Sequence, residues 1–354
     1  MACEPLGQRV LETCERLGFS AAGIADASPS RYERELREWL AAGRHGSMAW
    51  LARHVDVRLD VTRLLPGARS VVMVTDNYAA PGSDAREASA DHRHGRIARY
   101  ARGRDYHRVI KRRLHTLADE LRREHPDAGF RAFVDTAPAL ERELAQRAGL
   151  GWIGKHTLLL HQTRGSYMLI GGLATTLDLA PPAEQRTITD HCGTCTRCID
   201  ACPTEAITPY SVDASRCISY LTIERREAID RAFFPAMRDW IFGCDICQEV
   251  CPHNARAKGD VVIREEYAST RSGFDLLDVL RWREDDRQHA FNSASLKRAT
   301  LAMIKRNALI AAGNALARTH DPELVQRIRD IADNSTEPAM VRETATAVLD
   351  AIRP

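Results

Sequence analysis

Aromatic residues and net charge are both scarce in this chain. Phe, Trp and Tyr make up 6% of the 354 residues, and 50 basic against 48 acidic side chains leave a formal charge of +2. A net charge this close to zero gives no reason to expect a polyanionic partner. Hydrophobic residues still account for 44%, which is enough for packed cores, and the length predicts two or three domains.

Long apolar segments are also missing. No run approaches the roughly 18 residues of a membrane-spanning helix. The N-terminal segment predicts an amphipathic helix, and it lacks the apolar stretch and small-residue cleavage site of a secretion signal. We therefore expect a cytoplasmic protein without membrane contact, and we expect it to be a monomer.

The common nucleotide-binding motifs are absent. No G-x-G-x-x-G lies between a predicted strand and a predicted helix, and there is no Walker A motif. A Rossmann-type flavin or nicotinamide site is therefore not supported. The segment GLGWIGKH at 149–156 is glycine-rich and contains a lysine, but a plain turn between a helix and a strand explains it equally well.

Apolar periodicity predicts a mixture of helices and strands up to about residue 180. We expect helices over 5–18, 30–42, 105–124 and Pro138 to Ala148, strands over 19–26, 68–78, 130–135, 156–161 and 167–177, and a loop over 80–96. Three further helices are expected over 295–318, 322–333 and 337–352. An echo between 305–315 and 341–351 suggests a HEAT-like repeat, with a small helical cap as the alternative.

Most of the cysteines are clustered in one segment of the sequence. Eight of its ten cysteines lie between residues 192 and 251. Clustering of this kind in a chain without a secretion signal indicates metal binding, not disulfides. Cys3 and Cys14 lie on the first predicted helix, where we expect ordinary thiols.

The first cysteine run has the spacing of bacterial two-cluster ferredoxins. It reads C-x2-C-x2-C-x3-C-P, from Cys192 to Pro203. In such runs three closely spaced thiolates bind one [4Fe–4S] cluster and the fourth turns to the other cluster. Zinc sites also use C-x2-C pairs, but zinc explains neither the triple spacing nor the Cys-Pro ending.

The second run, from Cys244 to Pro252, reads C-x2-C-x3-C-P and lacks the first position of the signature. Cys217 is the one remaining cysteine nearby, and we assign it the missing place. We therefore expect two [4Fe–4S] clusters, which pass single electrons and imply a terminal acceptor. The predicted ligands are Cys192, Cys195, Cys198 and Cys251 for cluster one, and Cys202, Cys217, Cys244 and Cys247 for cluster two.

Asp135 ends a predicted strand just before the helix that Pro138 is expected to start. A carboxylate in this place can face a cleft, where it acts as a general acid if burial raises its pKa. The alternative is an N-cap for the following helix, a role that Thr136 could fill equally.

The segment 93–123 carries eleven Lys or Arg against three acidic residues. A phosphate-binding face and a solvated helix surface both explain this excess. Two tyrosines, Tyr100 and Tyr106, lie among the charges and favour a nucleic-acid or cofactor role. Four of the arginines recur every three residues: Arg93, Arg96, Arg99 and Arg102.

Taken in order, several segments resemble epoxyqueuosine reductases, the cobalamin-dependent family of the last step of queuosine biosynthesis on tRNA. The matching segments are RHVDVRLDVTRLLPGARSVV at 53–72, YARGRDYH at 100–107, DTAPALERELAQRAGLGWIGKHTLLL at 135–160, the cysteine runs, and RNALIAAGN at 306–314. Together they cover nearly the whole chain. The sequence is more distantly similar to reductive dehalogenases.

This resemblance implies an α+β architecture in three parts. A mixed α/β cobalamin-binding domain would occupy 1–182, a ferredoxin-like module with two [4Fe–4S] clusters 183–262, and an α-helical HEAT-like domain 263–354. The implied reaction is reductive removal of the epoxide oxygen of epoxyqueuosine at the tRNA wobble position. Electrons would pass from an external donor through the clusters to cobalamin, and tRNA would contact the basic segment and the C-terminal helices.

The resemblance also implies roles for particular residues. Asp135 would be the proton donor, and cobalt would carry no protein histidine, in agreement with the absence of a D-x-H-x-x-G motif. Gly171 and Gly172 depart from the Gly-Glu pair that the family usually has at this point. The residues expected at the cofactor are Arg58, Tyr100, Lys155, His156, Tyr167, Leu169, Ser219, Tyr220 and Asp245.

Two other functions compete with this one. A reductive dehalogenase-like enzyme would use the same cofactors on a small molecule, but the C-terminal helices and RNALIAAGN argue against it. A non-enzymatic ferredoxin-like carrier would bind iron without cobalt, so metal analysis separates it from the enzymes.

Overall fold

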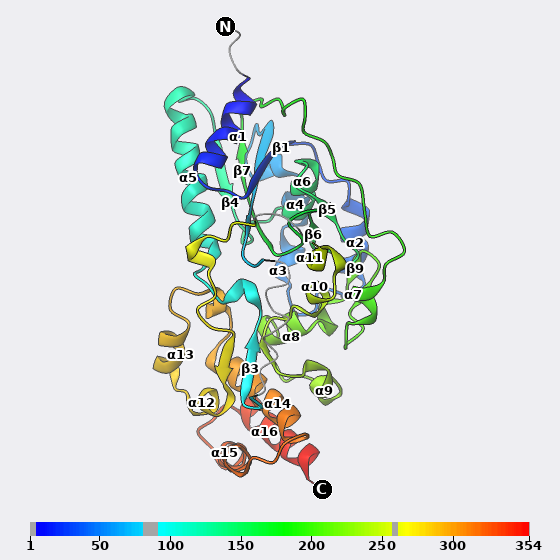
Figure 1. The fold of residues 1–354 in the computed structure, drawn as a ribbon, viewed down its shortest axis with the longest axis vertical. Helices are drawn as coiled ribbons and strands as arrows, with labels where there is room; N and C mark the ends of the chain where they lie inside the picture. Colours follow the sequence, from blue (N-terminus) through cyan, green and yellow to red (C-terminus); the bar gives the residue numbers. More distant parts are fainter. Residues whose placement is uncertain (1–4, 81–90, 257–260, 354) are drawn as a thin grey trace.

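The computed structural model describes residues 5–80, 91–256 and 261–353. Cys3 lies outside these ranges, as does most of the predicted loop over 80–96. Figure 1 shows a sheet-containing part at the N-terminal end and a helical part at the C-terminal end, with the cysteine-bearing segments along one side of the molecule. None of the helices in the described ranges has the length and apolar character needed to cross a membrane.

The main sheet is antiparallel and has the strand order β1-β2-β7-β4. Its strands are β1 (Ala21–Asp26), β2 (Ser70–Asn77), β7 (Met168–Thr175) and β4 (Phe130–Phe133). The residues of β2 from Val71 to Thr75 are β-branched or apolar, and all eight residues of the strand are buried. A strand of this kind needs cover on both faces, so helices must pack above and below the sheet.

Helices cover both faces of this sheet (Figure 1). On one face, Val72 and Val74 pack with α1 (Leu6–Arg16) and α5 (Tyr106–Glu124). On the other, Val71 and Met73 pack with α6 (Glu141–Arg147). Because side chains alternate along β2, one strand supplies both cores. The three-layer arrangement confirms the mixed α/β prediction for this part.

Gly171 and Gly172 allow neighbouring side chains to approach β7 closely. A Cβ at Gly171 would lie 2.6 Å from Ile110 Cγ2, and one at Gly172 would lie 2.3 Å from Phe133 Cζ. Phe133 therefore fills the space that a glutamate at position 172 would need.

A second, three-stranded sheet was not predicted from the sequence. Its order is β10-β3-β11, formed by β10 (Trp240–Phe242), β3 (His94–Ile97) and β11 (Gly273–Asp275). The loop prediction over 80–96 is therefore wrong over 94–96, which belong to β3. The three strands are short and far apart in the sequence, so no local sequence pattern predicts that they pair. β3 also links the three proposed domains, whose boundaries stay a prediction.

Two other boundaries differ from the predictions. The helix expected from Pro138 begins at Glu141, because the chain bends first at Asp135, whose φ is +54°. The strand expected over 156–161 is a two-residue strand, β6 (Leu159–Leu160), which pairs with β5 (Trp152–Ile153) outside the main sheet. Shorter helices here are α2 (Glu33–Ala41), α3 (Trp50–Arg53) and α4 (Val55–Leu59).

The cysteine-bearing region is built from short elements joined by turns, as expected for a segment organised around cofactors. They are α7 (Arg197–Asp200), β8 (Ile207–Thr208), β9 (Ser211–Val212), α8 (Ile218–Ile223), α9 (Phe234–Met237), α10 (Ile246–Glu249) and α11 (Pro252–Arg256).

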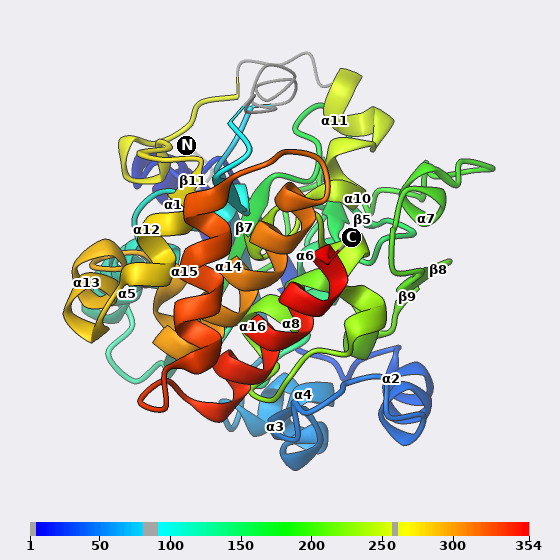
Figure 2. The ribbon, with the colours of Figure 1, turned by 90° about the horizontal axis from the view of Figure 1, so that it is seen from below.

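The C-terminal helices pack around α14 (Leu301–Leu316), which is buried along most of its length. Thr300 caps α14, and this cap separates it from the short 3-10 turn Ser295–Arg298, which splits the helix expected over 295–318. Figure 2 looks onto α14 with its neighbours α15 (Pro322–Asp333) and α16 (Ala339–Ile352). α12 (Leu276–Arg281) and α13 (Glu284–Ala290) complete this part, and a HEAT-like repeat stays a prediction.

Candidate active site and cluster-binding segments

The clustered cysteines form two neighbouring groups of four thiols, and none of them is in a disulfide. In the first group, burial and then the neighbouring thiols Cys192 and Cys195 raise the pKa of both Cys198 and Cys251. This grouping matches the expected ligand set of cluster one, although the ligand assignment itself stays a prediction.

The second group consists of four partly exposed thiols. Burial raises the pKa of Cys217, Cys244 and Cys247, with Cys202 a close neighbour of Cys217 and Cys247. Cys247 also interacts with Cys198, so the two groups adjoin. Within the described residues, no trio of His, Cys, Asp or Glu side chains is placed to hold a single metal ion.

Asp135, His107 and Asp105 form a chain of hydrogen-bonded side chains. His107 Nε2 lies 3.1 Å from Asp135 Oδ2, and His107 Nδ1 lies 2.7 Å from Asp105 Oδ1. Asp105 also caps α5 by accepting the backbone N–H of His107. Tyr106 stacks on the imidazole, with ring centroids 4.0 Å apart, so the ring orientation is fixed from two sides.

This chain sets the protonation state of the site. Burial disfavours the imidazolium of His107, but hydrogen bonds to Asp105 and Asp135 outweigh this and raise its pKa to about 9. The hydrogen bond from His107 in turn lowers the pKa of Asp135. The sequence predicts that Asp135 acts as an acid only if burial raises its pKa. Its pKa is lowered instead, so this condition is not met. At neutral pH the proton rests on His107 beside an ionised Asp135.

Asp135 stands open to solvent although protein groups surround it on most sides. Its side chain is 65% exposed, and its backbone N–H donates to Glu141 Oε1 at 2.5 Å. Burial, and then the Asp135 carboxylate, raises the pKa of Glu141 to about 8. Leu140 occupies the N-cap position of α6, so the N-cap alternative for Asp135 and Thr136 is wrong.

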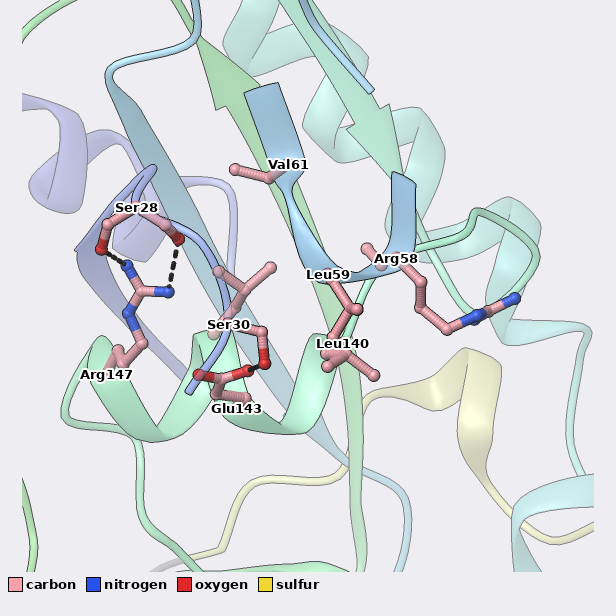
Figure 3. A pocket seen from close by; sticks show the side chains of 10 residues that line it. Ser28, Ser30, Arg58, Leu59, Val61, Leu140, Glu143 and Arg147 are labelled. Carbon is pink, nitrogen blue, oxygen red and sulfur yellow. Dashed lines mark hydrogen bonds between the residues drawn. The ribbon is translucent and has the colours of Figure 1, made fainter. Parts of the chain in front are cut away.

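Arg58 and Tyr100 lie near Asp135, while their expected contact with cobalamin stays a prediction. Asp135 is among the charges that act on the pKa of each. A small cavity lies between α4 and α6, and Arg58, Glu143 and Arg147 line it. In Figure 3 the Arg58 side chain points away from the other two. That cavity measures about 10 Å³, which is room for a single water, so it is not a cofactor site.

Tyr167 and Asp245 meet at Arg99, between the main sheet and the second thiol group. The Arg99 guanidinium lies 4.6 Å from the Tyr167 ring centroid, and Asp245 accepts the Arg99 backbone N–H at 2.8 Å. Tyr100 interacts electrostatically with both Asp135 and Asp245. Asp135 and Asp245, which follows Cys244 of the second thiol group, are therefore both neighbours of Tyr100.

His156 is buried with a fixed tautomer. Its Nδ1 accepts the backbone N–H of Leu158 at 3.1 Å, so the ring proton lies on Nε2. The side chain is 3% exposed, and Nε2 has no hydrogen-bond partner among the described residues. Burial, and then the nearby Arg142, lowers the pKa of His156 to about 4, so the imidazole is neutral.

For four other residues expected at the cofactor, the contact with cobalamin stays a prediction. Lys155 donates to the carbonyls of the first cysteine run, Leu169 belongs to the core between the sheet and α5, and the Tyr220 hydroxyl contacts Ser47. The Ser219 backbone N–H interacts with the Cys217 thiol.

The regularly spaced arginines do not form a phosphate-binding face. Arg93 binds Asp321, and Arg96 binds Glu249 while lying over Trp240. Their companions are buried: Arg99 is 6% exposed and Arg102 is 4% exposed. Their spacing reflects internal packing of β3 and the turn after it.

His107 and Glu141 are functional candidates that the sequence interpretation missed. The Asp-x-His pattern at 105–107 was a possible signal, because two acceptors on one imidazole are typical of a group that holds a proton. Glu141 gave no signal, since its burial depends on the bend at Asp135.

Comparisons with known proteins agree with this geometry. A family model described as "Epoxyqueuosine reductase QueG, DUF1730" matches residues 58–136, and one described as "4Fe-4S double cluster binding domain" matches residues 191–254. The epoxyqueuosine reductase of Pseudomonas aeruginosa is 38% identical over 313 residues, which cover 88% of this chain and 86% of that protein.

Two solved structures are similar over almost the whole chain. An epoxyqueuosine reductase with an epoxyqueuosine-modified tRNA-Tyr stem loop is 26% identical, with a TM-score of 0.87 over 98% of this chain and 90% of that one. The Bacillus subtilis enzyme, with its catalytic aspartate loop swung out of the active site, is 25% identical, with a TM-score of 0.86 over the same shares. The chain therefore belongs to the epoxyqueuosine reductase family.

Proposed function

We propose that this protein removes the epoxide oxygen of epoxyqueuosine at the wobble position of tRNA, giving queuosine and water. The observation that carries the proposal is the exposed Asp135–His107 pair; Asp135 and Asp245, beside the second of two four-thiol groups, are both neighbours of Tyr100. Family membership and the neighbour with a modified tRNA stem loop support this substrate. The reaction consumes two electrons and two protons.

The two groups of thiols would hold two [4Fe–4S] clusters. Each cluster passes one electron at a time, and the interaction between Cys198 and Cys247 places the groups next to each other. An external reductant would deliver electrons to the first cluster. The second would be held by thiols beside Asp245, which interacts with Tyr100, as does Asp135.

Cobalamin could accept hydrogen bonds from two buried donors that have no partner in the described residues. The buried Nε2–H of His156 and the Nε of Arg58 have no hydrogen-bond partners in the described part of the chain. Both are suited to the amide oxygens around a corrin ring. Because Nε2 of His156 carries the proton, it has no lone pair for cobalt. Bound cobalamin supplies a strongly reducing, nucleophilic cobalt that can open an epoxide.

The protein's own contribution to the chemistry is a positioned proton. His107 stores it at Nε2, 3.1 Å from Asp135 Oδ2. Asp135 accepts this proton and delivers it to the departing epoxide oxygen, a contribution of roughly 10²–10⁴-fold in rate. Glu141 is uncharged below a pH of about 8, which limits the negative charge around Asp135 while the oxygen leaves.

The exposed face of α5 is the surface proposed to hold the tRNA backbone. Its basic residues follow the three- and four-residue spacing of one helix face and begin beside His107. They contribute most of the exposed excess charge of the 93–123 segment, and phosphate contacts of this kind weaken with salt. The residues are Arg108, Lys111, Arg112 and His115 in α5 and Arg104 just before it, all exposed. The wobble nucleoside would turn out of the loop into the site.

Complementation tests the proposal in cells. The chain is expressed in a bacterial strain that accumulates epoxyqueuosine in tRNA, and the tRNA nucleosides are analysed by mass spectrometry. We expect queuosine to replace epoxyqueuosine, and we expect a Cys247→Ser variant to leave epoxyqueuosine in place. Unchanged epoxyqueuosine with a soluble, iron-loaded protein would contradict the proposal.

A further inference from the structure

The segment 149–155, which the proposed chemistry leaves without a role, forms one wall of the first thiol group. Trp152 opens β5 and is fully buried, at 0% exposure. Its indole packs in a small core with Leu160, Cys251 and Cys192. The rings of His191 and His253 contact it edge-on, with centroids 5.0 and 4.9 Å away, and fix its orientation.

The indole N–H of Trp152 is buried without a hydrogen-bond partner in the ranges that the structure describes. A buried donor of this kind is costly unless it has an acceptor. The indole packs directly against Cys192 and Cys251. The unpaired donor therefore lies beside two thiols of the first group.

Lys155 adds a positive charge to the same wall. Its Nζ donates to the backbone carbonyls of Gly193 at 2.6 Å and Cys195 at 3.0 Å. These bonds fix the loop between the first two cysteines around the cluster position. The nearby acid, Asp190, is exposed and accepts the backbone N–H of Cys192 and the hydroxyl of Tyr210, so solvent screens its charge.

The loop that carries the first three cysteines is exposed at Gly193, Thr194 and Arg197. An external reductant can therefore approach the first group through this loop.

We propose that Trp152 donates its indole N–H to the cluster on the first thiol group and, together with the charge of Lys155, raises the reduction potential of that cluster. Reduction adds negative charge, and hydrogen-bond donors and cations near the sulfurs stabilise the reduced form. The effect makes this cluster the better first acceptor for an incoming electron. This inference rests on the proposed function only in requiring that the cysteines bind clusters.

Redox titration of the reconstituted full-length protein, followed by electron paramagnetic resonance, tests the inference. In Trp152→Phe we expect one of the two reduction waves to shift to lower potential, because the ring remains while the donor is lost. Lys155→Gln should shift the same wave in the same direction. Trp282→Phe is the matched control, since Trp282 packs against Phe274 and Phe291 in the C-terminal part, and neither wave should move.

Each outcome has a defined meaning. A fully iron-loaded Trp152→Phe protein with two unshifted waves overturns the inference. If Trp152→Phe does not incorporate the first cluster, the Lys155→Gln variant tests the inference instead. An unshifted reduction wave in Lys155→Gln then overturns the inference. A wild-type protein that binds no clusters would instead contradict the proposed function.

Discussion

His107 and Asp135 form an ion pair across 3.1 Å at the mouth of the proposed site. The histidine comes from the first turn of α5 and the aspartate from the bend after β4, so two separate elements meet there. The pair places the proton on nitrogen and leaves the carboxylate free to accept it when negative charge develops on the substrate.

Replacement of Asp135 by asparagine should remove the proton transfer and retain the fold. The amide has the shape of the carboxylate but cannot pass a proton, so we expect single-turnover conversion to fall by roughly 10²–10⁴-fold. Iron content and tRNA affinity should remain at wild-type levels. Asp127→Asn, in an exposed turn, is the control. An unchanged single-turnover rate in Asp135→Asn would remove Asp135 from the mechanism.

The pH dependence should report His107. Its pKa is raised to about 9, so the proton is bound below that value and lost as the pH rises through it. We expect the wild-type rate to fall above pH 9 and the His107→Gln rate to be low without this alkaline limb. A His107→Gln profile with the same alkaline limb would assign the limb to another group.

Protonation of His107 also makes the free energy of unfolding depend on pH. Because the folded-state pKa of His107 lies above that of a free histidine, its stabilising effect is complete below a pH of about 6.5 and vanishes above 9. The difference in unfolding free energy between wild type and His107→Gln should shrink over this window. Urea denaturation at several pH values measures it, with the exposed His320→Gln as the control.

The sequence predicted the parts of this protein that local spacing determines. The spacing of the cysteine runs is typical of [4Fe–4S] ligands. The strand before Asp135 and the helix over 105–124 follow simple apolar patterns. These features need no knowledge of distant contacts. The grouping of the eight thiols in space agrees with the pairing that their spacing suggested.

The features that the sequence did not predict all depend on contacts between distant segments. β3 pairs with β10 and β11, which lie more than a hundred residues away. Burial raises the pKa of Asp135 as expected, but the hydrogen bond from His107, on another element, outweighs it and lowers this pKa. RNALIAAGN is one of the segments that carry the family resemblance, and its Arg306 is fully buried against the cysteine-bearing region.

Cys217 is the ligand with the weakest support from spacing, and its replacement is informative. Cys217→Ser should lose about four of eight iron atoms per chain and one set of electron paramagnetic signals. Cys14→Ser is the matched control, because Cys14 is a buried thiol in α1, far from both groups in sequence. Full iron content in Cys217→Ser would require a different eighth ligand.

Arg306 should prove to be a structural residue. Its guanidinium donates to the carbonyls of Leu221, Arg225 and Glu227 at 2.7, 2.8 and 2.6 Å, which ties α14 to the segment after Cys217. Arg306→Met leaves these acceptors unpaired and should lower the unfolding free energy by about 3 kcal/mol. Urea denaturation measures this, with the exposed Arg318→Met as control. Wild-type stability in Arg306→Met would contradict this role.

The basic face of α5 predicts a salt-dependent tRNA affinity. Reversing two of its charges, Arg108→Glu with Lys111→Glu, should weaken binding and lower the slope of log affinity against log salt by about 2. The comparison variant is Arg318→Glu with Arg329→Glu, exposed on the C-terminal part. A larger loss in the second variant would place the tRNA on the C-terminal helices.

The most direct test is an anaerobic reaction of the reconstituted protein, cobalamin and a strong reductant with tRNA that carries epoxyqueuosine. The digested nucleosides are then analysed by mass spectrometry. We predict the loss of one oxygen mass, dependent on both the protein and cobalamin. No conversion by a protein with intact clusters and bound cobalamin would contradict the account and favour a small-molecule substrate.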